Sequence, residues 1–311
     1  MPLRALLLLG VGLLFSAARS SSSIVLNWAQ NSSGRAFDGI GAVSGGGATS
    51  TFLLAYKEPQ RSQILDWLFL PNFGASLNIL KVELGADDQV STANVPRSSC
   101  GPSHACCLPD DGWLPARHMH VVCQTTDGSE ASHMRSQGEV DCYRGYEWEL
   151  MKEATRRNPH ITIYGLPWAW PGFLGFGTND PYTNVTATAE YTVTWIECAR
   201  DAHALNVSFI GLWNEESYTL EYILALRARL DAGGLRHVRI IAPDGGGSGI
   251  DEVARAMAAN ESVNAATWGL GAHYPGAAGT SDYVRAAGVP LWAAEDYSTY
   301  SDATGCPGLC H

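Results

Sequence analysis

The stretch Phe209-Ile210-Gly211-Leu212-Trp213-Asn214-Glu215 decides the fold of this chain. An apolar run ends here in a polar Asn-Glu pair, and a helix-like stretch follows at 218–230. This order predicts a buried parallel strand that delivers two side chains to the rim of an α/β fold. In α/β barrels the chemistry lies where the strands end. We therefore expect Asn214 and Glu215 at the catalytic rim of such a barrel.

The stretch Leu291-Trp292-Ala293-Ala294-Glu295 repeats the pattern. Strand-like runs at 238–242, 268–272 and 291–294 follow the first glutamate, and a barrel uses roughly 30 residues for each strand and its helix. Two carboxylic acids that face each other across a barrel mouth suit cleavage of a glycosidic bond, because that reaction needs one acid/base and one nucleophile. The alternative interpretation is that each glutamate only caps the start of a helix.

The whole chain contains seven strand-like runs, at 37–43, 77–84, 161–166, 209–213, 238–242, 268–272 and 291–294. Helical patterns occur between them, at 59–69, 143–157, 187–203 and 218–230. The predicted fold class is therefore α/β, a TIM (β/α)₈ barrel that is incomplete, with about seven strands. A missing eighth strand would leave two unpaired sheet edges.

Composition limits the class of function. The chain has 311 residues and is 46% hydrophobic, enough for one large domain. The formal net charge of −11 disfavours nucleic acid as a partner, because few cations are present to neutralise phosphates. Trp168 and Trp170 lie between two prolines at the end of the third strand, where they form either an aromatic platform for a sugar or hydrophobic filling under a loop.

The N-terminus predicts secretion. An arginine precedes the apolar run 5–15, and small residues follow it, so residues 1–22 are interpreted as a signal peptide. The run is too short to span a bilayer, and the mature chain is expected not to be transmembrane. Four Asn-X-Ser/Thr sequons are compatible with glycosylation in the secretory pathway, at Asn31, Asn184, Asn206 and Asn260.

Residues 90–124 break the barrel pattern. They show no helical or strand period and contain four of the eight cysteines, whose pairing the sequence leaves open. Adjacent Cys106 and Cys107 are unlike the paired cysteines of zinc modules, so no metal site is predicted. The loop Ser44-Gly45-Gly46-Gly47 lacks the lysine of a phosphate-binding loop, and no cofactor is predicted.

Several motifs together resemble the galactocerebrosidases (galactosylceramidases), a family of lysosomal glycoside hydrolases. They are the two glutamate motifs and the segments at 37–50, 56–66, 144–148 and 271–276. The resemblance covers nearly all of 37–300 except 90–124. It implies retaining hydrolysis of the β-galactosidic bond of galactosylceramide and psychosine, glycosphingolipid substrates broken down in the lysosome. It also implies a saposin-type lipid-presenting protein as partner.

The resemblance assigns roles to individual residues. Glu215 is expected to be the acid/base and Glu295 the nucleophile. Asn214 is expected to hold the sugar 2-hydroxyl. The remaining expected substrate contacts are Thr126, Trp168, His273 and Ser298.

Three departures from the family are visible. Glu216 stands where the family has a basic residue. The C-terminal β-sandwich and lectin-like domains of the family have no counterpart, and residues 23–36 would be an N-terminal strand of that missing β-sandwich. Removing 90–124 would restore the family's Gln-Thr-Thr-Asp-Gly sequence, so this insert is interpreted as a retained intron or a gene-model error. The alternative to an active enzyme is thus an inactive truncated isoform or gene-model fragment.

Overall fold

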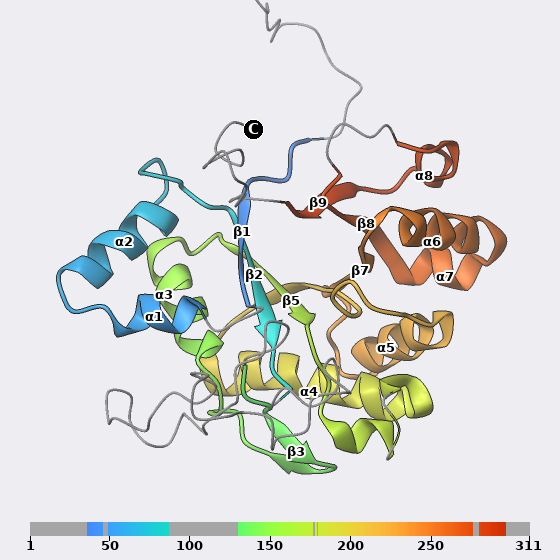
Figure 1. Cartoon of the computed structure of the whole chain (residues 1–311), viewed down its shortest axis with the longest axis horizontal. Coiled ribbons are helices and arrows are strands. Elements are labelled where there is room, and N and C mark those ends of the chain that lie inside the picture. The colour runs from blue at the N-terminus through green and yellow to red at the C-terminus, as the bar shows by residue number, and fades with distance from the viewer. Residues whose placement is uncertain are drawn as a thin grey trace, which may run out of the picture. The chain divides into compact units, whose positions relative to one another are not determined.

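Seven parallel strands form one sheet in the computed structural model (Figure 1). Their spatial order follows the chain: β1 (Gly41–Ser44), β2 (Ile79–Leu84), β5 (Thr162–Pro167), β6 (Val207–Ile210), β7 (Arg239–Gly245), β8 (Thr267–His273) and β9 (Leu291–Glu295). Every ladder between neighbours is parallel. This is the connectivity of a (β/α)₈ barrel, and the seven predicted strands are confirmed.

The structure describes residues 36–45, 49–86, 130–176, 178, 180–275 and 280–296. Within these residues the sheet ends at β1 and β9, which share no ladder. The chain from Gly39 onward forms one compact unit. Predictions for the signal peptide, the 23–36 strand and the 90–124 insert lie outside the described residues. So do those for Asn31, Thr126 and Ser298.

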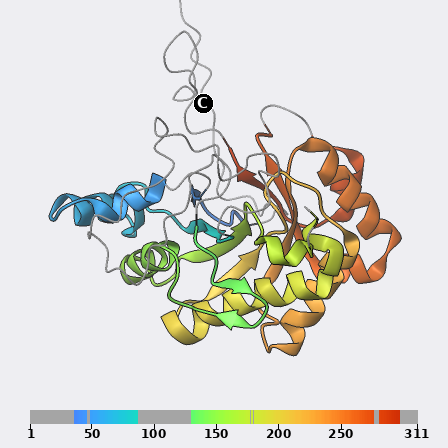
Figure 2. The same ribbon diagram turned by 60° about the horizontal axis from the view of Figure 1, so that its bottom comes forward.

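Helices lie on the outer side of the sheet (Figures 1 and 2). They are α1 (Thr49–Ala55), α2 (Gln60–Phe69), α3 (Glu147–Arg157), α4 (Val185–His203), α5 (Leu220–Ala232), α6 (Gly247–Ala259), α7 (Glu261–Ala266) and α8 (Asp282–Ala287). The four predicted helices correspond to α2, α3, α4 and α5. Two of them begin at capping side chains: Asn184 and Thr219 accept backbone N–H groups in the first turns of α4 and α5. No helix among the described residues is long and apolar enough to cross a membrane.

The interior of the barrel is filled by side chains from successive strands. Tyr164, Phe209 and Ile241 are buried there, with Trp268 and Trp292 packed against them. Phe209 lies 4.7 Å from Trp268 and 4.8 Å from Trp292 between ring centroids. A layer of aromatic side chains therefore fills the interior of the barrel.

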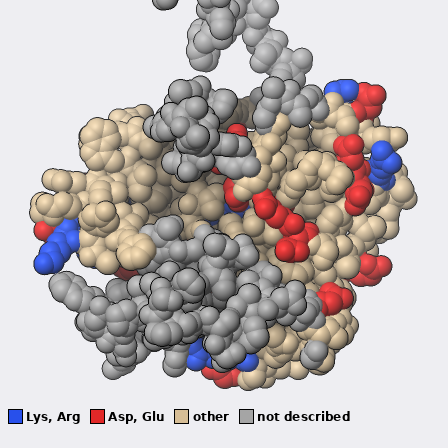
Figure 3. All heavy atoms as spheres, viewed as in Figure 1, with Lys and Arg blue, Asp and Glu red and all other residues tan. Residues whose placement is uncertain are grey.

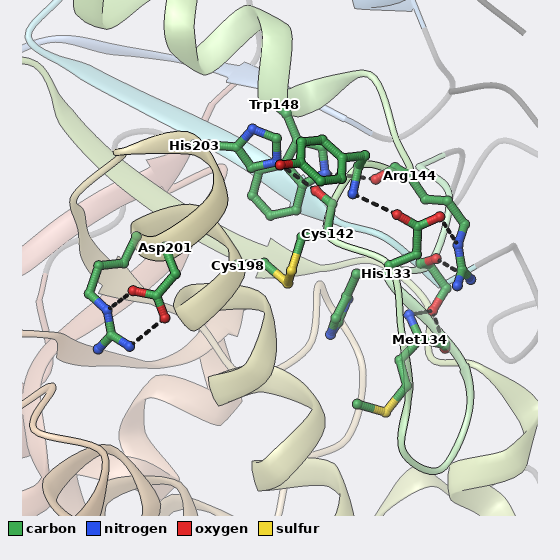
Figure 4. Close-up of a disulfide and its surroundings, with 12 residues drawn as sticks. His133, Met134, Cys142, Arg144, Trp148, Cys198, Asp201 and His203 are labelled. Atoms are coloured by element: carbon green, nitrogen blue, oxygen red, sulfur yellow. Dashed lines mark hydrogen bonds and ion pairs between the residues drawn. A yellow bond between two sulfur atoms is a disulfide. The ribbon is translucent and has the colours of Figure 1, made fainter. Parts of the chain in front are cut away.

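A disulfide joins α4 to the segment before α3 (Figure 4). It pairs Cys142 with Cys198, 56 residues later in the chain. Beside it, His203 stacks on Trp148 with 4.6 Å between ring centroids, and His203 Nε2 lies 2.5 Å from the Cys142 carbonyl oxygen. The segment also contains a small antiparallel hairpin that the sequence did not predict, β3 (Met134–Ser136) with β4 (Glu139–Val140).

Candidate active site

The two glutamates meet at the ends of their strands. Glu215 follows β6 and Glu295 is the last residue of β9. One oxygen of each carboxyl group and one ring nitrogen of His273 all lie within 4.8 Å of one another. The glutamate side chains are 43% and 19% exposed, so both are open to solvent to different degrees. In space filling, acidic side chains gather over β7–β9 on the face shown in Figure 3.

The backbone is strained where these strands end. Glu215, Asp244 and Tyr274 have φ angles of 56°, 69° and 48°, in the left-handed region that residues with a side chain rarely adopt. Each such residue costs about 1–3 kcal/mol, which the surrounding structure must offset. Two hydrogen bonds hold these turns: Glu215 N–H donates to Asp244 O (3.1 Å), and Tyr274 N–H donates to Glu295 O (2.9 Å).

Glu295 is held by a tyrosine and a lysine. The Tyr274 hydroxyl donates to Oε1 over 2.6 Å, and the Lys81 ammonium lies 3.6 Å from Oε2. Burial and the bond to Glu295 both raise the pKa of Tyr274, so its hydroxyl keeps its proton and stays a donor. Oε2 has no hydrogen-bond partner among the described residues. This oxygen is buried and faces the Lys81 ammonium.

His273 lies between two acidic groups. Its Nδ1 is 3.0 Å from Oε1 of Glu215, and its Nε2 is 2.5 Å from Oδ1 of Asp244. Its side chain is fully buried. Both ring nitrogens are thus engaged by carboxyl groups of the protein, and the substrate contact expected of His273 stays a prediction.

Lys81 and Asp244 form a buried ion pair, with 2.9 Å between Nζ and Oδ1. Lys81 points into the barrel because side chains alternate along β2, so its apolar neighbours Leu80 and Val82 face the helices. Its ammonium also donates to Ala294 O (3.2 Å). Burial alone would raise the pKa of Asp244, but Lys81 and His273 outweigh it and hold that pKa below its usual value.

Asn214 precedes Glu215 in the chain, and Trp168 follows the end of the neighbouring strand β5. Asn214 N–H donates to Pro167 O (2.9 Å), and the indole N–H of Trp213 donates to Trp168 O (3.0 Å), which ties the end of β6 to the end of β5. The Asn214 Oδ1 atom is buried and has no partner among the described residues. Lys81 Nζ lies 5.5 Å from the centroid of the Trp168 ring.

Trp170 does not belong to the site. Its side chain is 0% exposed and packs edge-on against Tyr182, Tyr191 and Tyr222 in the core between sheet and helices. The interpretation of Trp168 and Trp170 as one aromatic platform is therefore wrong for Trp170, which is hydrophobic filling.

A cluster of three acidic residues is buried near this site. Glu83 (β2), Glu130 and Glu147 (α3) are each at most 2% exposed. Glu130 accepts N–H groups from Tyr146 (3.0 Å) and Glu147 (3.2 Å), and Ser44 Oγ lies 2.6 and 2.8 Å from the two carboxyl oxygens of Glu147. Burial and then the charge of Glu147 raise the pKa of Glu130. Burial, with a further contribution from Glu83, raises the pKa of Glu147 to about 8 despite the bond from Ser44.

This acidic cluster adjoins the candidate active site at Gly45, whose φ is +140°. A Cβ atom at Gly45 would lie 2.9 Å from Glu83 Cβ and 3.3 Å from the ring of Trp168. This close approach explains part of the glycine loop in the sequence, because only glycine lets the backbone pass there.

Three described sequons have exposed asparagines. Asn184, Asn206 and Asn260 all lie on the surface. Asn184 and Asn260 use their carbonyl oxygen to cap α4 and α7. A glycan would attach to the amide nitrogen, so capping and glycosylation use different atoms of the same side chain.

The structure brings together five residues that the sequence singled out: Trp168, Asn214, Glu215, His273 and Glu295. Sequence analysis missed Lys81, Asp244 and Tyr274. A weak signal existed for the first two. Lys81 is the one basic residue of a buried strand, and Asp244 follows the apolar run of the fifth strand. Such charges are rarely buried without a partner, which is reason to look for one.

One ligand atom each from Glu215, His273 and Glu295 would fit around a metal ion. The donors already have uses within the protein, however. Tyr274 donates to Glu295, His273 bonds to Glu215, and Lys81 brings a positive charge to the same place. The arrangement therefore suits acid–base and nucleophilic chemistry by the side chains themselves.

Comparisons with known proteins match this chain to one family of glycoside hydrolases. The sequence model of glycosyl hydrolase family 59 matches residues 37–106 and 119–310. The match leaves out 107–118, a shorter stretch that lies within the predicted insert. Galactocerebrosidase from Danio rerio is 46% identical over 272 residues, which cover 88% of this chain and 35% of that protein.

Other relatives give the same result. Galactocerebrosidase from Homo sapiens is 45% identical over 277 residues, covering 88% of this chain and 35% of that protein. The putative galactocerebrosidase of Caenorhabditis elegans is 34% identical over 291 residues, covering 93% and 38%. The chain thus spans about a third of the length of the curated relatives it matches.

Solved structures show the same fold at low sequence identity. SrfJ from Salmonella typhimurium superposes with a TM-score of 0.57 at 19% identity, over 77% of this chain and 51% of that chain. The endo-β1,6-glucanase BT3312 gives a TM-score of 0.52 at 18% identity, over 82% and 56%. At such identities the likeness concerns the fold alone, and it supports the barrel architecture.

Proposed function

The chain belongs to glycosyl hydrolase family 59, and from this premise we propose that it is the catalytic part of a galactosylceramidase. The reaction is retaining hydrolysis of the β-galactosidic bond of galactosylceramide and psychosine. The observation that carries the proposal is the approach of Glu215 and Glu295, which have carboxyl oxygens within 4.8 Å of each other. Retaining glycosidases hold the two carboxyl groups about 5–5.5 Å apart, whereas inverting enzymes keep them at least about 6.5 Å apart.

The mechanism follows from the surroundings of each glutamate. Glu295 attacks the anomeric carbon with its carboxylate, which the bond from Tyr274 to Oε1 keeps in place. Glu215 gives its proton to the departing ceramide oxygen as the old glycosidic bond breaks. Water then attacks the galactosyl-Glu295 ester, Glu215 takes a proton from that water, and galactose leaves with its original configuration.

Asn214 and Trp168 complete the sugar site in this proposal. The buried Oδ1 of Asn214 has no protein partner among the described residues, and the amide suits a hydrogen bond with the sugar 2-hydroxyl. Such a bond strengthens as charge develops in the transition state. Thr126 and Ser298 remain expected contacts from the resemblance, outside the described residues.

We further propose that the protein works in the lysosome, which it reaches as a glycoprotein through the secretory pathway, and that a saposin-type protein presents its lipid substrate. The disulfide between Cys142 and Cys198 supports an oxidising folding compartment. The exposed sequon asparagines support glycosylation. The raised pKa values of Glu130 and Glu147 suit an acidic setting, where both groups stay protonated without cost.

Active-site labelling tests the function. A 2-deoxy-2-fluoro-galactosyl fluoride should form a stable ester, which peptide mass spectrometry should locate on Glu295. Turnover of an aryl β-galactoside should retain configuration and disappear in Glu295→Gln. The matched control is Glu216→Gln, an exposed carboxyl beside the acid/base. Inverted product, a label on another residue, or no turnover above the Glu295→Gln background would contradict the proposal.

A further inference from the structure

One buried chain of polar side chains connects the two catalytic carboxyl groups. At its centre, Oδ1 of Asp244 accepts from Lys81 Nζ (2.9 Å) and lies 2.5 Å from His273 Nε2, which is itself 3.4 Å from Lys81 Nζ. From Asp244 the contacts lead to both glutamates. His273 Nδ1 lies 3.0 Å from Oε1 of Glu215, and Lys81 Nζ lies 3.6 Å from Oε2 of Glu295. The side chains of Asp244 and His273 are 0% exposed and that of Lys81 is 3% exposed. Water therefore does not compete for these contacts.

We propose that Asp244 is a positioning residue for proton transfer, which holds His273 with Nε2–H toward itself and Nδ1 toward the acid/base Glu215. This inference deepens the proposed function and rests on it. Asp244 touches neither substrate nor reacting atoms, and it acts only through His273 and Lys81.

The tautomer of His273 follows from the chemistry of its partners. An ionised carboxylate only accepts hydrogen bonds, so the nitrogen facing Asp244 must carry a proton. Nδ1 then has two complementary states. In a neutral ring it accepts the proton of a Glu215 carboxylic acid, and in an imidazolium it donates to Glu215. The ring can thus pair with Glu215 both before and after the proton is given away.

Several charged groups face His273 from different strands. Asp244 comes from β7, Lys81 from β2, Glu215 from the turn after β6, and Glu295 from β9, while Tyr274 is its neighbour on the chain. Burial alone lowers the pKa of His273, and Lys81 acts in the same direction. The bonds to Asp244 and Glu215 outweigh them, and the net pKa lies above the ordinary histidine value.

The arrangement matches the movement of charge during the reaction. Before attack, the negative charge is on Glu295, next to the Lys81 ammonium. When Glu295 forms the ester, it becomes neutral, and Glu215 becomes the carboxylate after losing its proton to the leaving oxygen. The negative charge then lies next to His273. In the imidazolium form, which has taken up a second proton from solvent, the Nδ1–H of His273 donates to that carboxylate. Asp244 bonds both cationic groups and so keeps each one beside its own carboxyl group.

Histidine NMR tests the inference without requiring turnover. In the chain labelled with ¹⁵N-histidine, the His273 signals are assigned by their loss in His273→Asn. We expect a protonated Nε2 at every pH at which the protein is folded, and an apparent pKa above the ordinary value. In Asp244→Asn the pKa should fall and the protonated nitrogen of the neutral ring should change. Glu215→Gln, at a partly exposed position, should shift the Nδ1 resonance and leave Nε2 protonated.

The outcomes decide the proposal. A neutral His273 with its proton on Nδ1 would overturn it, as would a titration that Asp244→Asn leaves unchanged. If Asp244→Asn does not fold, the Glu215→Gln spectrum still decides, because an unchanged Nδ1 resonance contradicts the contact. The matched control is Asp66→Asn, which removes a 2.6 Å bond to the buried Arg157 far from this site and should leave His273 unchanged.

Kinetics separate failure of this inference from failure of the proposed function. With a phenyl β-galactoside, whose leaving group needs a proton, Asp244→Asn should lower kcat/KM by about 100-fold or more. With a 2,4-dinitrophenyl leaving group, which departs unprotonated, the loss should stay below about tenfold. Equal losses with both substrates would show a merely structural role for Asp244. If the unmodified chain had no galactosidase activity, the proposed function would be contradicted. The NMR experiment would still test whether Asp244 sets the tautomer of His273.

Discussion

The hydroxyl of Tyr274 donates a 2.6 Å hydrogen bond to Oε1 of Glu295, across the ends of two neighbouring strands. Because the other oxygen of Glu295 is buried beside the Lys81 ammonium, this bond and that ion pair together hold the carboxylate in one orientation. The raised pKa of Tyr274 keeps the donor protonated at any pH at which the protein would work.

Tyr274→Phe should therefore slow formation of the Glu295 ester. A hydrogen bond to a charged group contributes about 1.5–3 kcal/mol, so kcat/KM for an aryl β-galactoside should fall roughly 10- to 100-fold. The folded state should be little affected. Tyr283→Phe is the control, because that ring lies exposed on α8 beneath Arg255. Equal kinetics for Tyr274→Phe and the unmodified chain would contradict the assignment.

Gly211 gives room to the buried carboxylate of Asp244. A Cβ atom there would lie 2.4 Å from Leu166 Cδ1, 2.7 Å from Asp244 Oδ2 and 2.8 Å from the Tyr164 hydroxyl. Gly211→Ala should lower the free energy of unfolding by about 1–3 kcal/mol and also reduce kcat, because Asp244 must move. Urea unfolding and kinetics measure the two effects. Gly247→Ala, where a Cβ would meet nothing within 4 Å, should change neither.

Stability should fall as pH rises, through the buried carboxyl groups. The pKa of Glu147 is raised to about 8 in the fold, above its ordinary value of 4.5. A raised pKa means that the fold favours the protonated form. The stabilisation is therefore complete below about pH 4.5 and is lost as pH rises through about 8. This group should lower Tm between pH 5 and 8, and the decrease should be clearest above about pH 6.5, where the opposite contribution of the lowered pKa of buried His133 is complete.

Substitution at Glu147 isolates this effect. Glu147→Gln cannot ionise and should flatten the pH dependence of Tm, with Glu130 accounting for the part that remains. Glu149→Gln is the matched control, since Glu149 is exposed on the same helix and should leave the slope unchanged. A pH dependence of Tm that Glu147→Gln leaves unchanged would be incompatible with the raised pKa of Glu147.

Removal of the disulfide should destabilise the fold. The double variant Cys142→Ser, Cys198→Ser should lose about 2–4 kcal/mol of unfolding free energy, the usual contribution of a bond that closes a loop of this size. Reductant should lower the Tm of the unmodified chain to a similar degree and have no effect on the double variant. If the two proteins respond alike to reductant, this bond does not form in solution.

The catalytic glutamates at the strand ends could be predicted from the sequence, but the buried residues that contact them could not. Glu215 and Glu295 were visible because each follows an apolar run, and strand ends in a parallel barrel meet at one rim. Lys81 and Asp244 were hidden, because their importance depends on which face of a strand points inward and on contacts between residues far apart in the chain. The pairing of Cys142 with Cys198 depends on the packing of α3 against α4 and was open for the same reason.

The left-handed backbone at Glu215, Asp244 and Tyr274 affects how natural and engineered variants at these positions should be interpreted. Valine, isoleucine and threonine strongly disfavour that conformation. Such replacements therefore disturb the backbone at these positions, whatever the chemical role of the original side chain. An inactive Thr variant of Glu215 would thus say nothing about acid–base roles. A catalogue of variants at this rim is informative only for near-isosteric replacements, such as glutamine, asparagine and phenylalanine. A screen that pools all substitutions would report three essential positions without saying why.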